Sequence, residues 1–271
     1  LTDELFDQER NLPRMPFNTA VYQDQKPYKI AYFKTDGWFE PCVTSLRAVD
    51  EAVAGLRKQG HAVEEIAIPL DGWFSYGLLV AINVAEGKFR SFAEGLEGEP
   101  IMPHYDALML SLTIPEWLRF IVCRVIDARR SHLLSQGKAN GCSVFELWKK
   151  LADIKFLKNK WSDTMQGYDA VVMPAVPIPA PPHGLSGEIT GAYSYMFNAN
   201  MLDWPCGSVP VTQVRKDETH YNNCPHNDEY TRQVREKVMP GSEGMPMSVN
   251  VMACAFEDEK CLHVMKEIES A

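Results

Sequence analysis

The chain has 271 residues, of which 45% are hydrophobic and 23% are charged, and this size is enough for one large α/β domain or two small ones. Its net charge of −9 argues against a protein that binds nucleic acid, because such a protein needs a basic face to meet the phosphates. No apolar stretch approaches the roughly 18 to 20 residues of a membrane-spanning helix, and the first residues lack the charged and apolar regions of a signal peptide. The first residue is not methionine, so we expect the chain to begin within a longer protein.

The first part of the chain has the pattern of a strand, a helix and a second strand. Residues 27–33 alternate and are rich in β-forming residues, residues 43–59 carry apolar side chains at helical spacing, and residues 62–69 form another β-like run. Gly60 between them is typical of a helix end. Such a βαβ unit favours parallel pairing of its two strands.

The middle of the chain is predicted to be mostly helical. Residues 73–96 show a long helical pattern that glycines interrupt, and residues 105–114 fit either a helix or a strand. Pro115 begins a helix at the first-turn position that proline favours. Ser143 and Glu146 have the spacing of a capping box, which predicts a helix that extends to about residue 165.

The last part of the chain mixes strands, helices and a proline-rich segment. The proline density of residues 174–182 excludes a helix or a central strand there. Residues 215–241 are polar, and we expect a solvent-exposed loop around one short helix. The remaining predictions are strands at 168–173, 208–214 and 247–255 and helices at 191–202 and 257–269. The fold class that follows is α/β.

The seven cysteines form no C-x-x-C pair and no regular framework, which is typical of the reduced thiols of an intracellular protein. They stand at positions 42, 123, 142, 206, 224, 254 and 261. Cys224 lies near His220 and His226, but this spacing matches no standard zinc site, so we expect no metal.

Three segments of unusual local composition occur in a fixed order. They are YDAVVMP at residues 168–174, GAYSYMFNANMLDWPCGSVPVT at 191–212, and GMPMSVNV at 244–251 followed by EKCL at 259–262. In order and spacing they resemble the amidase-signature family, and most closely the fatty acid amide hydrolases within it. The N-terminal βαβ unit and residues 108–118 also fit, so the resemblance covers nearly the whole chain. It implies that residues 1–271 are the C-terminal portion of an amidase-signature domain, with part of a mixed sheet covered by helices.

The family's catalytic segment has no counterpart in these residues. Its chemistry uses a serine nucleophile, a second serine and a lysine, and its glycine- and serine-rich loop supplies the donors that stabilise the oxyanion. The nearest stretches here, residues 184–188 and 241–244, match neither that loop nor a G-x-S-x-G elbow. We therefore assign no catalytic residue to this chain and expect the serines and the lysine to come from a preceding N-terminal segment. The resemblance implies neither a metal nor an organic cofactor.

The resemblance assigns a substrate-binding role to four residues. Thr190, Tyr193, Phe197 and Leu108 match positions that line the family's acyl-chain channel. Tyr193 and Phe197 are four residues apart, so a helix can present both rings to one cavity. The alternative is a packed core face, since aromatic residues at helical spacing are usually that.

Residues 115–139 resemble the family's membrane-facing cap. Trp117, Leu118, Phe120 and Ile121 form an apolar face, and flanking arginines would suit an anionic lipid surface. The alternatives are an ordinary surface helix that folds on the core and one half of a homodimer contact. The cap would place the protein inside the cell, peripherally on the cytoplasmic face of a membrane.

The function that the resemblance implies is hydrolysis of fatty acid amides, such as N-acylethanolamines and primary fatty amides, to a fatty acid and an amine. The expected partners are that substrate and the N-terminal catalytic segment, which would dock on an exposed apolar face. Two alternatives stay open. The chain is either a non-catalytic remnant that binds lipid or a partner, or part of an amidase for short amides in which Tyr193 and Phe197 are filled core.

Overall fold

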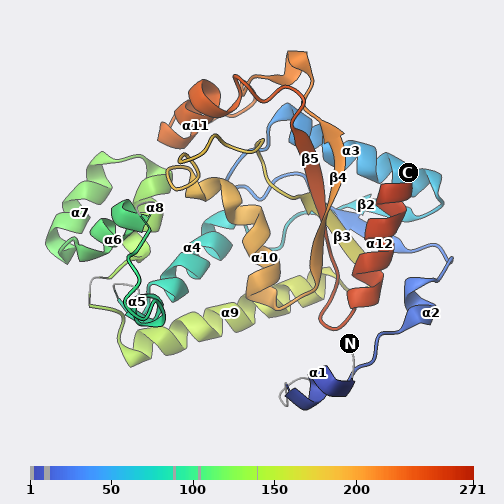
Figure 1. Cartoon of the computed structure of the whole chain (residues 1–271), viewed down its shortest axis with the longest axis horizontal. Helices are drawn as coiled ribbons and strands as arrows, with labels where there is room; N and C mark the ends of the chain where they lie inside the picture. Colours follow the sequence, from blue (N-terminus) through green and yellow to red (C-terminus); the bar gives the residue numbers. More distant parts are fainter. Residues whose placement is uncertain (1–2, 9–12, 88–89, 103–104, 139) are drawn as a thin grey trace.

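The computed structural model describes residues 3–8, 13–87, 90–102, 105–138 and 140–271. The described chain forms a five-stranded mixed sheet with helices on both faces (Figure 1). The strands are β1 (Lys29–Tyr32), β2 (Ala62–Glu65), β3 (Ala170–Pro174), β4 (Cys206–Gln213) and β5 (Pro246–Met252). The longer helices are α3 (Val43–Lys58), α4 (Gly72–Asn83), α6 (Asp106–Thr113), α7 (Glu116–Val125), α8 (Ala128–Gln136), α9 (Val144–Thr164), α10 (Ser194–Leu202) and α12 (Asp258–Ser270). The shorter ones are α1 (Asp3–Gln8), α2 (Thr19–Tyr22), α5 (Arg90–Gly95), η2 (Thr190–Tyr193), η3 (Lys216–Glu218), α11 (Glu229–Gln233) and η4 (Val234–Val238).

The sheet has the strand order β2-β1-β3-β5-β4. β1 pairs in parallel with β2, as the βαβ pattern predicts, and also with β3, whereas β5 pairs antiparallel with both β3 and β4. The α/β class and the mixed sheet are therefore confirmed. β4 is the last strand in this order, so one of its edges is open among the described residues.

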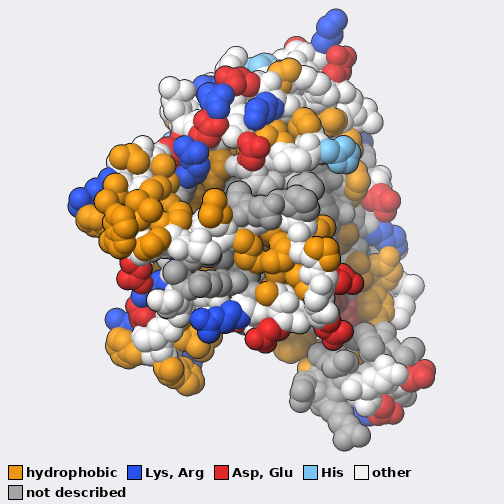
Figure 2. Space-filling view, turned by 60° about the vertical axis from the view of Figure 1, so that its left-hand side comes forward, with side chains coloured by type: hydrophobic (Ala, Val, Ile, Leu, Met, Phe, Trp, Pro, Cys, Tyr) orange, Lys and Arg blue, Asp and Glu red, His pale blue; other side chains and the backbone are white. Residues whose placement is uncertain are grey.

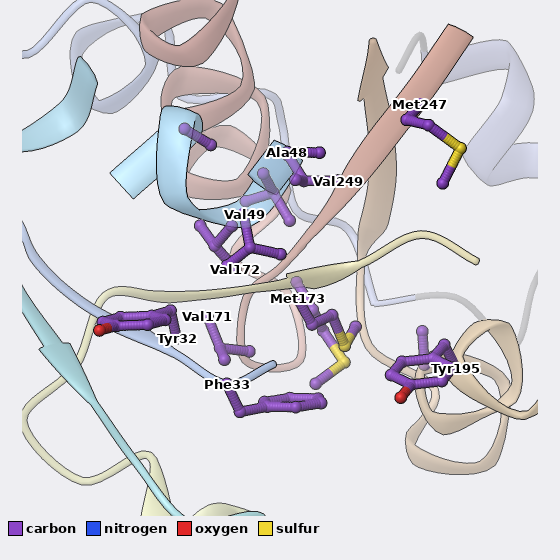
Figure 3. Close-up of a cluster of buried hydrophobic side chains, with 14 of the residues drawn as sticks. Tyr32, Phe33, Ala48, Val49, Val171, Val172, Met173, Tyr195, Met247 and Val249 are labelled. Carbon is purple, nitrogen blue, oxygen red and sulfur yellow. The ribbon is translucent and has the colours of Figure 1, made fainter. Parts of the chain in front are cut away.

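Two apolar layers cover the two faces of the sheet (Figure 3). On one face, Val172 of β3 and Val249 of β5 lie beside Ala48 and Val49 of α3, and α12 packs on the same side against β4. On the other face, Met173 lies toward Tyr195 of α10. Successive side chains of a strand point to opposite faces, so the all-buried strand β3 supplies both layers.

Several predicted boundaries are confirmed for the expected physical reason. The Ser143 hydroxyl accepts from the backbone N–H of Glu146, and the Glu146 carboxylate accepts from that of Ser143, which completes the capping box of α9. α3 ends at Lys58, and Gly60 follows with a left-handed φ of +98°. Within the described residues, no helix is both long and apolar enough to cross a membrane.

Three predicted segments differ from the structure. The second strand stops at Glu65 instead of residue 69. The helical pattern of residues 73–96 is divided, since α4 ends at Asn83 and α5 begins at Arg90. The predicted cap from Pro115 is divided as well, since α7 ends at Val125 and the Asp127 carboxylate accepts from the backbone N–H of Arg130 at 3.0 Å to begin α8.

The expectation of a plain exposed loop at residues 215–241 is wrong. Tyr221 and Tyr230 are buried there, at 1% and 4% exposure, and η3, α11 and η4 give the segment regular structure. Arg47 of α3 donates to both carboxylate oxygens of Glu218, at 2.7 Å each. The polar composition of the segment indicated exposure. The segment is ordered by contacts with residues such as Arg47, which are distant in the sequence and therefore not visible in a local pattern.

Candidate substrate-binding site

The segment 190–205 is built as a turn of 3₁₀ helix, a short α-helix and a left-handed stop. η2 leads directly into α10, and Asp203, with φ of +56°, ends α10 before β4. Two buried rings fix the start of the segment. The Trp38 indole Nε1–H donates to the carbonyl of Gly191 at 3.0 Å, and the Tyr76 hydroxyl donates to that of Thr190 at 2.9 Å.

A buried carboxylate holds the inner side of α10. Asp36 accepts from the backbone N–H groups of Trp38 and Phe39, at 2.9 and 3.0 Å, and from the Ser194 hydroxyl. Burial raises the pKa of Asp36, although these hydrogen bonds act in the opposite direction. Ser194 is only 3% exposed and its hydroxyl is engaged by Asp36, so it is not a nucleophile that a substrate could reach.

A cavity of about 290 Å³, which we call cavity A, lies between α4, α8 and the start of η2. Thr190 lines it, as does Tyr76. Phe197 is not among the lining residues, but its ring stacks on Tyr76 with the centroids 5.5 Å apart and the planes at 9°. Leu108 lies on α6, whose next turn contributes Ser111 to the wall, and the Leu108 side chain is outside the described part of the structure.

A second cavity of about 510 Å³, cavity B, lies on the other side of the same segment. Tyr193 lines it, opposite the proline-rich stretch and the ends of β4 and β5. Ser208 and Asn250, which are register partners in those strands, also line it. The structure thus brings Thr190 and Phe197 together around Tyr76 and places Tyr193 at a different cavity.

The segment 115–139 carries an apolar surface on α7. Trp117, Phe120 and Ile121 are 67%, 58% and 50% exposed, whereas Leu118 is half-buried. The Arg124 guanidinium lies over the Phe120 ring at 3.8 Å from its centroid. Figure 2 shows hydrophobic side chains gathered on this side of the molecule with Lys or Arg beside them.

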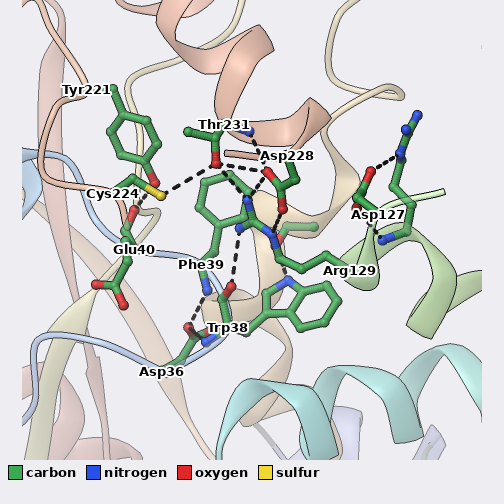
Figure 4. Close-up of polar contacts among 12 residues, drawn as sticks. Asp36, Trp38, Phe39, Glu40, Asp127, Arg129, Tyr221, Cys224, Asp228 and Thr231 are labelled. Carbon is green, nitrogen blue, oxygen red and sulfur yellow. Dashed lines mark hydrogen bonds and ion pairs between the residues drawn. The ribbon is translucent and has the colours of Figure 1, made fainter. Parts of the chain in front are cut away.

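One buried ion pair fastens α8 to the segment after β4 (Figure 4). Arg129, which is 1% exposed, binds both carboxylate oxygens of Asp228 at 2.5 Å. Arg129 also donates to the Trp38 carbonyl and the Thr231 hydroxyl, and it lies over the Phe39 ring. Burial alone would raise the pKa of Asp228, but the hydrogen bonds and charge of Arg129 outweigh it and lower that pKa.

The side chains that the structure describes form no cluster suited to a metal ion. No group of three or more His, Cys, Asp or Glu among them could hold one. The thiol of Cys224 contacts the Thr231 hydroxyl at 3.5 Å, beside the Arg129 pair.

A comparison with known protein families identifies the family of this chain. Residues 3–262 match the model of the amidase family, "Amidase", so the chain belongs to it.

Its relatives include fatty acid amide hydrolases from two animals. The chain is 29% identical over 271 residues to fatty acid amide hydrolase 1 of Caenorhabditis elegans, a match that covers 98% of this chain and 46% of that protein. It is 27% identical over 277 residues to fatty-acid amide hydrolase 1 of Sus scrofa, which covers 99% and 47%. The chain therefore spans about half the length of these relatives.

Solved structures show the same fold. A fatty acid amide hydrolase superimposes with a TM-score of 0.69 at 15% identity, over 98% of this chain and 43% of that one. A bacterial aryl acylamidase of the amidase-signature enzymes superimposes with a TM-score of 0.58 at 13% identity, over 97% and 48%.

Of the residues that line cavity A, the sequence predicted only Thr190, and the missed ones include Tyr76 and Arg119. Tyr76 lies inside the long helical pattern of residues 73–96. This pattern does not distinguish an aromatic side chain of the core from one that lines a cavity. Arg119 counted as a polar residue of the cap, yet it is 5% exposed and lines cavity A. Its position between Leu118 and Phe120, three residues before Val122, is the signal that could have indicated burial.

Proposed function

We propose that this chain forms the substrate-binding half of an enzyme that hydrolyses fatty acid amides to a fatty acid and an amine. The nucleophilic serine, the second serine and the lysine would come from a segment outside these 271 residues. The observation that carries the proposal is the match to fatty acid amide hydrolases over 98% and 99% of this chain but only 46% and 47% of those proteins.

The open edge of β4 supports a missing neighbour. β4 is eight residues long and pairs only with β5 among the described strands. Long open edges invite pairing with another strand, and monomeric proteins usually shorten or cover them. Cavity B lies over β4 and β5, since Ser208 of β4 and Asn250 of β5 both line it. A catalytic segment that paired with the open edge of β4 would lie next to a strand that lines this cavity.

The walls of the two cavities support an acyl substrate. Thr190 and the Tyr76–Phe197 stack lie at cavity A, and Tyr193 lies at cavity B, so the segment 190–197 would separate two parts of one binding channel. Each CH₂ group of an acyl chain that leaves water for an apolar wall contributes roughly 0.8 kcal/mol. We include Leu108 among the acyl-binding residues because residues 108–118 resemble the family.

Replacing Phe197 by alanine in an enzyme that carries the upstream segment is expected to impair long substrates selectively. The ring that supports Tyr76 is lost, so kcat/KM for oleamide should fall about 10-fold, as for changes of a methylene or more in an apolar pocket. The value for a short aryl amide should change less than about 3-fold, because such a substrate would not reach that wall.

Phe256→Ala serves as the control, because Phe256 is 58% exposed in the turn before α12. Equal losses on the two substrates with Phe197→Ala would contradict the channel and favour the reading of these aromatics as filled core.

The exposed face of α7 supports contact with a membrane surface. An amphipathic helix with aromatic and aliphatic residues on one side and arginines beside them binds the lipid interface. Trp117, Phe120 and Ile121 meet this description, with Arg124 over Phe120, whereas Leu118 is half-buried.

Removing two aromatic rings from this face should weaken membrane binding. We expect the variant with Trp117→Ser and Phe120→Ser to bind phosphatidylserine-containing vesicles about 10-fold less tightly in co-sedimentation, because buried apolar area drives interfacial binding. Trp148→Ser on α9 is a matched control, since Trp148 is also 67% exposed. If the control variant lost as much binding as the α7 variant, the membrane contact would not be specific to the cap.

A further inference from the structure

Cavity A contains a buried cation that has no anionic partner among the described side chains. Arg119 of α7 is 5% exposed, and it forms no ion pair within the described part of the structure. Its Nε–H is buried and has no hydrogen-bond partner in the described part of the molecule. A guanidinium keeps its charge at any ordinary pH, so this group cannot become neutral to relieve its burial.

The rest of the Arg119 guanidinium is held by the ends of two helices. Nη1 donates to the carbonyl of Leu134 in the last turn of α8, at 3.1 Å. Nη2 donates to the carbonyls of Ile114 and Ser111, at 3.1 and 3.3 Å, where α6 ends. Carbonyls at helix C-termini carry partial negative charge, which orients and partly stabilises the cation but supplies no full counter-charge.

The walls around this cation are mainly apolar. Val80, Val84 and Leu133 line cavity A together with the ring of Tyr76. The volume of about 290 Å³ lies at the lower end of the roughly 300 to 1,000 Å³ that is typical of small-molecule sites. A charged donor at one point of a small apolar cavity matches a ligand with one anionic end and a short hydrocarbon body.

We propose that cavity A binds an aliphatic carboxylate of medium length, with the carboxylate on Arg119 and the hydrocarbon chain among the apolar side chains of α4 and α8. The carboxylate lies against the part of the Arg119 side chain that lines the cavity and supplies the missing negative charge, and interactions between two charged groups are the strong class. The chain displaces water from Val80 and Leu133.

This site has a consequence for the reaction, and that consequence rests on the proposed function. Hydrolysis of a fatty acid amide releases a carboxylate that the neutral substrate lacks. Thr190, which we assigned to the acyl channel, lines the same cavity, so a fatty acid bound head-first on Arg119 would occupy space that the acyl chain of the substrate needs. Binding of the carboxylate itself does not depend on catalysis.

The first experiment measures binding by the 271-residue chain without turnover. Octanoate and octanamide are titrated by calorimetry at pH 7, where the acid is ionised. We expect octanoate to bind at least about 10-fold more tightly than octanamide, and Arg119→Met to remove that preference. Arg130→Met on α8, whose side chain is 42% exposed and does not line cavity A, should leave octanoate binding unchanged.

Equal affinity for octanoate and octanamide in the unaltered chain would overturn the proposal, and this comparison needs no variant. Equal affinity of Arg119→Met and the unaltered chain for octanoate would also overturn it. If Arg119→Met does not fold, the NMR resonance of the Arg119 Nε–H in the unaltered chain tests the proposal. This resonance should shift when octanoate is added and stay unchanged with octanamide, and no shift with octanoate would overturn the proposal. Competitive inhibition by octanoate in the extended, active enzyme tests the link to the reaction separately, so an inactive enzyme would leave the binding result standing.

Discussion

Replacing Trp38 by alanine is expected to lower the free energy of unfolding by about 3–5 kcal/mol, as large-to-small changes of buried aromatic residues do. The Trp38 side chain is fully buried. Its ring meets Trp73 edge-on at 4.6 Å between centroids and also contacts Tyr76 and His132, so it joins the loop after β1 to α4 and α8. Urea unfolding followed by circular dichroism measures the loss.

The same substitution should also disturb cavity A. The Nε1–H of Trp38 holds the Gly191 carbonyl next to Thr190, and without it the start of η2 loses one of its two ring anchors. Trp117→Ala is the matched control, since Trp117 is 67% exposed and surface changes usually stay within about 0.5 kcal/mol. Similar losses for the two variants would contradict the central place of Trp38 in the fold.

Replacing Arg129 by methionine should be equally severe. Removing one partner of a buried ion pair typically costs about 3–5 kcal/mol, because the other charge stays buried without compensation. Arg129 and Asp228 have side chains that are 1% and 12% exposed, so little water can replace the lost partner. Thermal and urea unfolding of the purified variant measure the effect.

A double-mutant cycle separates the pair from its surroundings. Asp228→Asn alone should destabilise, but the variant with both changes should lose less than the sum of the two single losses, because no uncompensated charge remains. Arg130→Met is the control, since the Arg130 side chain is 42% exposed and its pair with Asp127 is worth only about 0–1 kcal/mol. Strict additivity of the two changes at Arg129 and Asp228 would contradict an energetic role for the pair.

Local signals in the sequence were sufficient for many helix and strand positions and for the class of fold. The capping box of Ser143 and Glu146 and the glycine after α3 act within a few residues, so their patterns predicted the ends of α9 and α3. The βαβ pattern predicted the parallel pair β1 and β2. Residues 73–96 were predicted as one pattern because apolar periodicity continues across the break that follows Asn83.

Long-range partners could not be predicted in the same way. Arg129 and Asp228 are 99 positions apart, and neither residue type at its place in the sequence indicates a buried pair. The polar segment 215–241 was therefore predicted to be an exposed loop, although it buries Tyr221 and Tyr230. The substrate assignment of Thr190, Tyr193, Phe197 and Leu108 stays a prediction, and the structure adds that the segment 190–197 stands between two cavities instead of facing one.

The most direct test of the account is hydrolysis of oleamide and of a short aryl amide by this chain alone and by the chain extended with an upstream amidase segment. We expect no hydrolysis by the chain alone, since it lacks the family's glycine- and serine-rich loop, and hydrolysis of oleamide once the segment is restored. Hydrolysis by the chain alone would contradict the account by showing that a nucleophile lies within these residues. Hydrolysis by neither form would favour a non-catalytic remnant that binds lipid or a partner.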